Sequence, residues 1–432
     1  MFRKKEILLT GFALFAMLFG AGNLIFPPVV GYNSGSLWSF SALGFFITGI
    51  GFPLMAILSS AFAGDKLDSF GEKVSPLFSK IFNILLILSI GPLLALPRTG
   101  ATAFEMALAP HISSTESLYI KPIFLAIYFS ISLLFSLKSS KVIDRIGKFL
   151  TPILLIILSF IIYKGISNPI GIPTAPKITG IFKYGFFNGY QTMDTLGAIV
   201  FSGIILKSIR QGKQLTKKQE INFLIKSSLI ALIALGMVYG GLLYIGATSS
   251  GVLSNRGTTK LLSDIIIHLL GHLGIIALGI CVAGACLTTA VGLTATVGDY
   301  FSSLLKISYE KIVILTTIIG FVLSNFGVDF IVKFSAPILV FLYPIAIVLI
   351  ALNFFKNKLN NKTYLGAVIG AGFVGIIEMF QALNININVL NIIYNYLPLK
   401  EFGLAWFIPS IILGFFFQII FKRKNIEKYN IA

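Results

Sequence analysis

The stretch Leu18-Phe19-Gly20-Ala21-Gly22-Asn23-Leu24-Ile25-Phe26-Pro27-Pro28 interrupts an apolar run that extends from residue 7 to residue 30. A run of this length can cross a bilayer as a helix, but two glycines and an asparagine halfway across it weaken that helix. Backbone that leaves a helix at membrane depth is tolerated only where it faces protein or a wet cavity. The stretch therefore predicts a broken transmembrane helix that faces the interior of a bundle.

Such a break offers ligands for ions of both signs. If helical hydrogen bonding fails at positions 20 to 23, the carbonyls of residues 16 to 19 lose their donors and can face a cation. The amides of Ala21, Gly22 and Asn23 then begin a new half-helix, whose dipole favours a carboxylate. Small residues also permit close helix packing in membranes, and this motif alone leaves both interpretations open.

The whole chain has the composition of a membrane protein. Of its 432 residues, 56% are apolar and 12% are charged, whereas soluble domains carry about 25% charged residues. Short loops separate twelve apolar runs, each compatible with a transmembrane helix, at residues 7–30, 38–62, 79–104, 119–137, 146–163, 186–206, 221–246, 273–297, 311–327, 331–355, 364–383 and 402–421. This pattern predicts an all-α polytopic fold of about twelve helices in one transmembrane domain.

The chain has a net charge of +18, and the distribution of its basic residues among the loops indicates its orientation in the membrane. A nucleic-acid partner would require basic residues concentrated on one segment, but here they are shared among short loops, so no such partner is predicted. With alternate loops on opposite sides, 25 of the 34 Lys and Arg fall on the face that carries both termini, and 8 fall on the other. The positive-inside rule then predicts cytoplasmic termini.

The sixth apolar run contains a second interruption, Gly189-Tyr190-Gln191-Thr192-Met193-Asp194-Thr195-Leu196-Gly197. A carboxylate inside a membrane span is a functional candidate by default. The first and sixth spans are equivalent if residues 1–165 and 166–355 form two five-helix repeats of opposite topology, followed by two additional helices and a tail at 356–432. Paired interrupted helices indicate the binding site of a secondary transporter, and they favour the functional interpretation of both breaks.

Two further spans carry polar groups. Arg98 in the third span could form a buried charge pair with Asp194 or with Glu105, and a structural pair is at least as plausible as a role in transport. In the eighth span, Thr288 and Thr289 place adjacent hydroxyls in an apolar helix, although such hydroxyls commonly bond back to their own backbone.

Several other chemistries lack the residues that they need. His268 and His272 have metal-capable spacing on Leu261–Gly271, which we expect to be a helix covering the bundle, but no further ligand accompanies them. Cys281 and Cys286 face different sides of one helix, so no local disulfide follows. No phosphate-binding loop and no nucleophile–base pair is present, which argues against direct ATP coupling and against an enzyme.

Four segments resemble the signature sequences of the bacterial branched-chain amino acid:cation symporter family: GAGNLIFPP at 20–28, GPLLALPRTG at 91–100, GYQTMDTLGAIVF at 189–201 and CLTTAVGLTATVGDYF at 286–301. The resemblance extends from the first span to the last. It implies a leucine-transporter-like fold of five-plus-five inverted repeats with two further helices. It also implies import of leucine, isoleucine or valine across the bacterial cytoplasmic (inner) membrane, with a sodium ion for coupling and no other cofactor.

The resemblance also assigns ligands by position. Sodium would be held by three carbonyls and two hydroxyls, from Ala16, Phe19, Ala285, Thr288 and Thr289. The substrate carboxylate would meet the amides of Ala21 and Gly22, with Asn23 as a further candidate. The substrate ammonium would meet carbonyls or the carboxylate in the unwound part of the sixth span, formed by Gln191, Thr192, Met193, Asp194 and Thr195.

Three alternatives remain at this stage. A transporter of the same fold could couple to protons, with Asp194 as the titrating group. An ion channel would usually need rings of pore-lining groups or oligomeric symmetry, whereas these motifs occur once each. A membrane enzyme is the third alternative, and it lacks a catalytic cluster.

Overall fold

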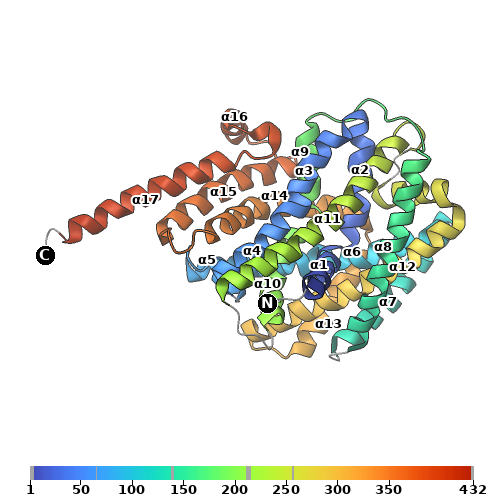
Figure 1. The fold of residues 1–432 in the computed structure, drawn as a ribbon, viewed down its shortest axis with the longest axis horizontal. Helices are drawn as coiled ribbons and strands as arrows, with labels where there is room; N and C mark the ends of the chain where they lie inside the picture. Colours follow the sequence, from blue (N-terminus) through green and yellow to red (C-terminus); the bar gives the residue numbers. More distant parts are fainter. Residues whose placement is uncertain (1–3, 65, 138–140, 211–215, 255–256, 430–432) are drawn as a thin grey trace.

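The computed structural model is a bundle of helices (Figure 1). It describes residues 4–429 except 65, 138–140, 211–215 and 255–256, and no strand occurs in these described ranges. Four of the basic residues used for the orientation prediction, Arg3, Lys138, Lys213 and Arg256, lie outside them. The all-α architecture agrees with the fold class predicted from the sequence.

The helices follow one another in the order of the predicted spans. The first half contains α1 (Lys4–Leu18), α2 (Ala21–Ser34), α3 (Trp38–Phe46), a π-helical turn η2 (Ile47–Gly51), α4 (Phe52–Ala63), α5 (Pro76–Leu88), a second π-helical turn η4 (Ser89–Leu93), α6 (Ala95–Ala107), α7 (Ser114–Leu137) and α8 (Lys141–Ser167). The second half contains α9 (Ile181–Tyr190), α10 (Asp194–Arg210), α11 (Lys217–Ser249), α12 (Thr258–Leu305), α13 (Tyr309–Ser324) and α14 (Val328–Asn353).

Three more helices follow the two halves: α15 (Asn361–Ala382), the short α16 (Asn388–Tyr396) and α17 (Phe407–Tyr429). Single 3-10 turns occupy Gly35–Leu37, Leu67–Phe70, Ala109–His111 and Lys400–Phe402. The α15 helix packs against α14 and α17, and the C-terminal part of α17 projects away from the bundle (Figure 1). The boundaries of the two halves at residues 165 and 355 stay a prediction.

Within the described residues, seven continuous helical stretches are long and apolar enough to cross a membrane. They are Ala21–Ala63, Pro76–His111, Ser114–Leu137, Lys217–Ser249, Thr258–Leu305, Val328–Asn353 and Asn361–Ala382. This number falls short of twelve partly because the broken first and sixth spans consist of short pieces, while Ala21–Ala63 joins parts of two predicted spans. The structure thus supports a polytopic membrane protein, and the count of twelve stays a prediction.

Both predicted breaks are present. The first lies between Leu18 and Ala21, where Gly20 adopts an extended conformation with φ −119° and ψ −168°. The second lies between Tyr190 and Asp194, where Met193 has a φ of 62° in the left-handed region that non-glycine residues rarely adopt. The first helix resumes at Ala21, within the stretch of residues 20 to 23 that was predicted to be open.

The third span contains an interruption that the sequence analysis did not predict. Between α5 and α6, Gly91 has a non-helical backbone with φ −91° and ψ −122°. Pro92 follows it and has no N–H to donate to the preceding turn. The predicted covering helix also forms: Gly271, with a φ of 67°, separates the beginning of α12 from the part that belongs to the eighth span.

Glycines hold pairs of helices from opposite halves at backbone contact. In the pair formed by α2 and α11, a methyl group on Gly31 would overlap the carbonyl of Leu243, and one on Gly246 would overlap the carbonyl of Pro28. The pair formed by α3 and α9 repeats this arrangement, since Gly185 lies against the carbonyl of Ser41. In each pair one helix comes from the first half and one from the second, so the two halves are interleaved.

Candidate functional site

A cavity of about 80 Å³ lies where the four sequence motifs meet. It is bordered by the break between α1 and α2, by η4 and α6, by the unwound segment before α10, and by α12. Its lining comprises Met17, Leu18, Gly20, Ala21, Gly22, Asn23, Ile90, Ala95, Arg98, Thr99, Thr192, Met193, Asp194, Gly197, Phe201, Thr289 and Leu293. Segments that are far apart in the sequence therefore form one small site with an apolar wall and a few polar groups.

Six of the eight predicted substrate residues line this cavity: Ala21, Gly22, Asn23, Thr192, Met193 and Asp194. The side chains of the other two, Gln191 and Thr195, contact neighbouring helices. The Gln191 side chain accepts a hydrogen bond of 2.8 Å from the hydroxyl of Ser335 on α14, and the Thr195 hydroxyl donates to the carbonyl of Thr48 at 3.4 Å. These two residues thus fasten the unwound segment to its surroundings.

Asn23 links the two breaks. Its side-chain amide donates to the Leu18 carbonyl at 3.0 Å and to the Asp194 carboxylate at 2.5 Å, and it also contacts the Tyr239 hydroxyl. Its amide oxygen accepts from the Gly20 N–H at 3.2 Å, which caps the start of α2. One of the carbonyls freed by the break, that of Leu18, is therefore already bonded within the protein.

Tyr239 is a member of the site that the sequence analysis missed. It lies on α11 and is fully buried, and its hydroxyl donates to the same Asp194 oxygen at 3.4 Å. A single tyrosine in an apolar span carries no local signal of function. Its role depends on the packing of α11 against α1 and α2.

Arg98 is buried, with 3% of its surface exposed, and points its guanidinium at the unwound segment. Its Nη1 donates to the Gln191 carbonyl at 2.5 Å and its Nη2 to the Thr192 carbonyl at 3.4 Å. Its Cζ lies 5.4 Å from the centre of the Phe26 ring. Arg98 thus helps to hold open the second break from a neighbouring span.

Neither carboxylate considered as a partner for Arg98 forms an ion pair with it in the part of the chain that the structure describes. Glu105 instead accepts hydrogen bonds from the Thr259 hydroxyl at 2.5 Å and from the Val328 N–H at 2.9 Å. Asp194 lines the same cavity as Arg98 but is bonded to Asn23 and Tyr239. The charge pair considered for Arg98 and Asp194 is therefore not a direct contact in this conformation.

Position 22 has no room for a side chain because Arg98 and Phe26 lie against it. A Cβ at this position would lie 2.8 Å from Nη2 of Arg98 and 3.2 Å from Cε2 of Phe26. Real Cβ atoms are essentially never closer than 3.0 Å to another group. The first turn of α2 therefore lies directly against the guanidinium.

Of the five predicted sodium ligands in the described chain, Thr289 alone lines the cavity. The hydroxyls of Thr288 and Thr289 donate to the Ala285 carbonyl at 2.8 and 3.0 Å, as hydroxyls in membrane helices often do. Each hydroxyl oxygen keeps its lone pairs for a cation, whereas the two lone pairs of the Ala285 carbonyl are engaged.

Ala16 on α1 and Phe19 directly after that helix, the predicted ligands from the first span, are not in the described lining. The ring of Phe19 stacks with the rings of Phe15 and Tyr239, at centroid distances of 5.1 and 6.4 Å. Its side chain therefore belongs to the packing between α1 and α11, while its carbonyl stays a predicted ligand.

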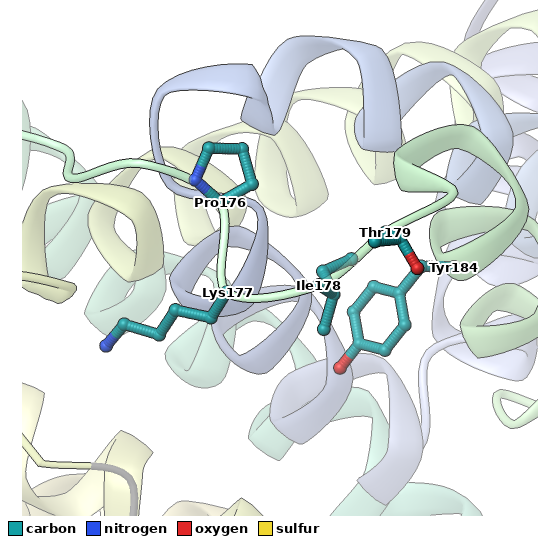
Figure 2. A pocket seen from close by; sticks show the side chains of 5 residues that line it. All are labelled: Pro176, Lys177, Ile178, Thr179 and Tyr184. Carbon is teal, nitrogen blue, oxygen red and sulfur yellow. The ribbon is translucent and has the colours of Figure 1, made fainter.

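Another depression, of about 520 Å³, lies on the loop between α8 and α9 and shares no residue with the cavity. Pro176, Lys177, Ile178, Thr179 and Tyr184 line it, and the Lys177 side chain extends away from Tyr184 (Figure 2). The Lys177 ammonium donates to the Ser250 carbonyl at 2.9 Å. The depression is open, and one loop and the start of α9 form all of its lining, so we assign it no ligand.

No histidine or cysteine is among the described residues that line the cavity. His268 and His272 are exposed on α12, and no group of three potential metal ligands among His, Cys, Asp and Glu occurs in the described residues. Cys281 and Cys286 are both free and buried.

The arrangement of helices identifies the class of protein to which this fold belongs. MhsT in its complex with L-phenylalanine aligns over 95% of this chain and 97% of its own, with a TM-score of 0.58 and 19% identity. Mhp1, a nucleobase-cation-symport-1 family transporter, aligns over 97% of this chain, with a TM-score of 0.61 and 14% identity in its inward-facing form and 0.63 and 12% in its closed form. The two Mhp1 alignments cover 91% and 93% of those chains. The fold is that of leucine-transporter-like membrane transporters.

Within that class the family is also defined, because the model of the branched-chain amino acid transport protein family matches residues 3–424. The branched-chain amino acid permease BraB of Bacillus subtilis is 38% identical over 94% of both chains. The permease BrnQ of the same organism is 38% identical over 97% of this chain and 98% of its own. This chain belongs to the branched-chain amino acid transport protein family, as the four motifs predicted. Its relatives are named permeases and carriers, in agreement with the prediction that it is not an enzyme.

Proposed function

We propose that this protein is a sodium symporter that imports leucine, isoleucine and valine across the bacterial cytoplasmic membrane by alternating access. The observation that supports this function best is the cavity at the two breaks, in a chain 38% identical to proteins named branched-chain amino acid permeases. Its wall contains Met17, Ile90, Phe201 and Leu293, which suit an aliphatic side chain of intermediate size. MhsT, which has the same fold, was solved in complex with an amino acid.

In this proposal the polar groups orient the substrate and the cation. The free amides in the first turn of α2 receive the substrate carboxylate, because a helix N-terminus favours negative charge. Asp194 and the carbonyls of the unwound segment receive the ammonium. Thr289 contributes a hydroxyl oxygen to a sodium ion beside the cavity, and such oxygens suit a hard cation.

Proton coupling is a second candidate because Asp194 is the one acidic side chain in the described lining. A buried carboxylate within reach of both substrate and solvent could carry the proton. In that case a pH gradient would replace the sodium gradient as the driving force.

Uptake of radiolabelled leucine into proteoliposomes distinguishes the two. We expect accumulation when an inward sodium gradient is imposed at equal pH on both sides, and none when a potassium gradient replaces it. Isoleucine and valine should compete with leucine, whereas lysine and glutamate should not. Accumulation driven by a pH gradient without sodium would replace the sodium mechanism by the proton mechanism. Absence of leucine, isoleucine and valine uptake under both gradients would refute the proposed function.

A further inference from the structure

Two opposite charges line the cavity without forming an ion pair. Arg98 and Asp194 are 3% and 6% exposed, and both contribute to the lining. No ion pair shorter than 4 Å joins Arg98 to a carboxylate in the part of the chain that is described. A buried charge is costly unless another charge compensates it. The guanidinium therefore has no carboxylate in direct contact at the edge of the cavity that a ligand would occupy.

The donors of Arg98 are only partly used. A guanidinium has five N–H donors in a planar fork. Nη1 donates a bond of 2.5 Å to the Gln191 carbonyl, and Nη2 donates a longer bond of 3.4 Å to the Thr192 carbonyl. Donors therefore remain for an acceptor in the cavity.

A second set of donors lies beside the guanidinium. The first amides of α2 have no acceptor within their own helix. Gly22, which has no side chain, allows Nη2 of Arg98 to pack against this turn. Amides and guanidinium thus converge on the same edge of the cavity, and both favour a carboxylate.

We propose that Arg98, together with the amides of Ala21 and Gly22, binds the α-carboxylate of the substrate. Asp194, the negatively charged residue of the cavity, binds the α-ammonium. This inference rests on the proposed transport of amino acids and adds the residue that recognises the carboxylate. The zwitterion places an opposite charge in direct contact with each side chain. The site consequently requires both charged groups of the amino acid and tolerates variation in the aliphatic side chain.

The recognition also connects the two breaks through the third span. Arg98 contacts the carbonyl of Gln191, three residues before Asp194, and packs against Gly22. A substrate whose carboxylate binds Arg98 and whose ammonium binds Asp194 therefore meets groups from the first, third and sixth spans at once. An aliphatic amine without a carboxylate would leave the guanidinium uncompensated.

The test measures thermal stabilisation of the purified full-length protein by three ligands at saturating sodium. These are leucine, 3-methylbutylamine, which lacks the carboxylate, and 4-methylpentanoate, which lacks the ammonium. We expect each truncated ligand to bind at least about tenfold more weakly than leucine, since a hydrogen bond to a charged group is worth about 1.5–3 kcal/mol. If 3-methylbutylamine stabilises the wild-type protein as well as leucine does, the inference is overturned. If leucine itself does not bind, the proposed function fails instead.

Variants of Arg98 then separate recognition of the substrate carboxylate by the guanidinium from a structural role in supporting the unwound segment. In Arg98→Gln the preference for leucine over 3-methylbutylamine should fall towards one, and Arg98→Lys should recover part of it because the charge is restored. A merely structural Arg98 would weaken both ligands equally and leave their ratio unchanged, which would overturn the inference. Arg210→Gln is the matched control, because Arg210 lies at the end of α10, pairs with Glu220 at 2.9 Å and is absent from the cavity lining. If neither Arg98 variant folds, equal stabilisation of the wild-type protein by leucine and 3-methylbutylamine would still overturn the inference.

Discussion

Substitution of Gly22 by alanine should weaken leucine binding without harming the fold. The new Cβ would lie 2.8 Å from Nη2 and 3.2 Å from Cζ of Arg98, whereas ordinary contacts begin at 3.4 Å. The nearest atoms belong to the far end of a flexible side chain, so the guanidinium moves and the backbone stays. Its bond of 2.5 Å to the Gln191 carbonyl is then stretched, and the guanidinium leaves the position from which it would bind the substrate carboxylate.

The size of the effect follows from the hydrogen bond that the displaced guanidinium would otherwise donate to the substrate carboxylate. A hydrogen bond to a charged group contributes about 1.5–3 kcal/mol, and 1.4 kcal/mol corresponds to a tenfold change in affinity. The dissociation constant for leucine should therefore rise by about 10- to 100-fold if the bond is lost completely, and by less if Arg98 adapts. Alanine is the better helix former by about 0.5–1 kcal/mol, which offsets the cost of a stretched bond between Arg98 and Gln191, so the melting temperature should change little.

Leucine affinity and the melting temperature are measured together on purified, monodisperse protein. The matched control is Gly236→Ala on α11, where an added Cβ meets no atom within 4 Å. We expect the control to keep its affinity and Gly22→Ala to lose it at an unchanged melting temperature. An unchanged leucine affinity in a folded Gly22→Ala protein would refute the contact between Gly22 and Arg98 as a determinant of the site.

Three other outcomes are expected. Thr289→Ala should raise the sodium concentration for half-maximal leucine uptake, because the hydroxyl lines the cavity; an unchanged value would limit this hydroxyl to its bond with Ala285. Gly31→Ala should lower the yield of monodisperse protein, because its methyl group would overlap the backbone of Leu243; a normal yield would contradict the close packing of α2 and α11. A reporter that is active only in the cytoplasm should be active when it is fused to the C-terminus, given the distribution of basic residues. If it is inactive there, and a reporter that is active only outside the cytoplasm is active at the same position, the predicted orientation is wrong.

The breaks in the first and sixth spans were predictable because their sequences contain glycine, asparagine and aspartate where a membrane helix needs apolar residues. The interruption in the third span was not predicted, although Gly91-Pro92 was a usable signal. The two prolines in α2, Pro27 and Pro28, lie inside a helix that continues to Ser34. Proline alone therefore does not determine where a helix of this protein ends.

The connections within the site were not predictable from the sequence. Local pattern identifies Arg98 as a buried charge, but it does not say that its partners are the carbonyls of Gln191 and Thr192. Those carbonyls become available only because another span unwinds. Similarly, Thr288 and Thr289 are equivalent in composition, and only the rotation of α12 against its neighbours decides that Thr289 faces the cavity.

The interleaving of the two halves has a consequence for biogenesis. Ribosomes complete the first half before the second, so α2 enters the membrane when α11 has not yet been synthesised. Until then the glycine surface around Gly31 has no backbone to pack against, and the same holds for α3 before α9 arrives. Neither half can complete its packing alone. Packing between the halves therefore cannot begin before α9 and α11 have been synthesised, and two halves supplied as separate polypeptides should mature only when both are present in the same membrane.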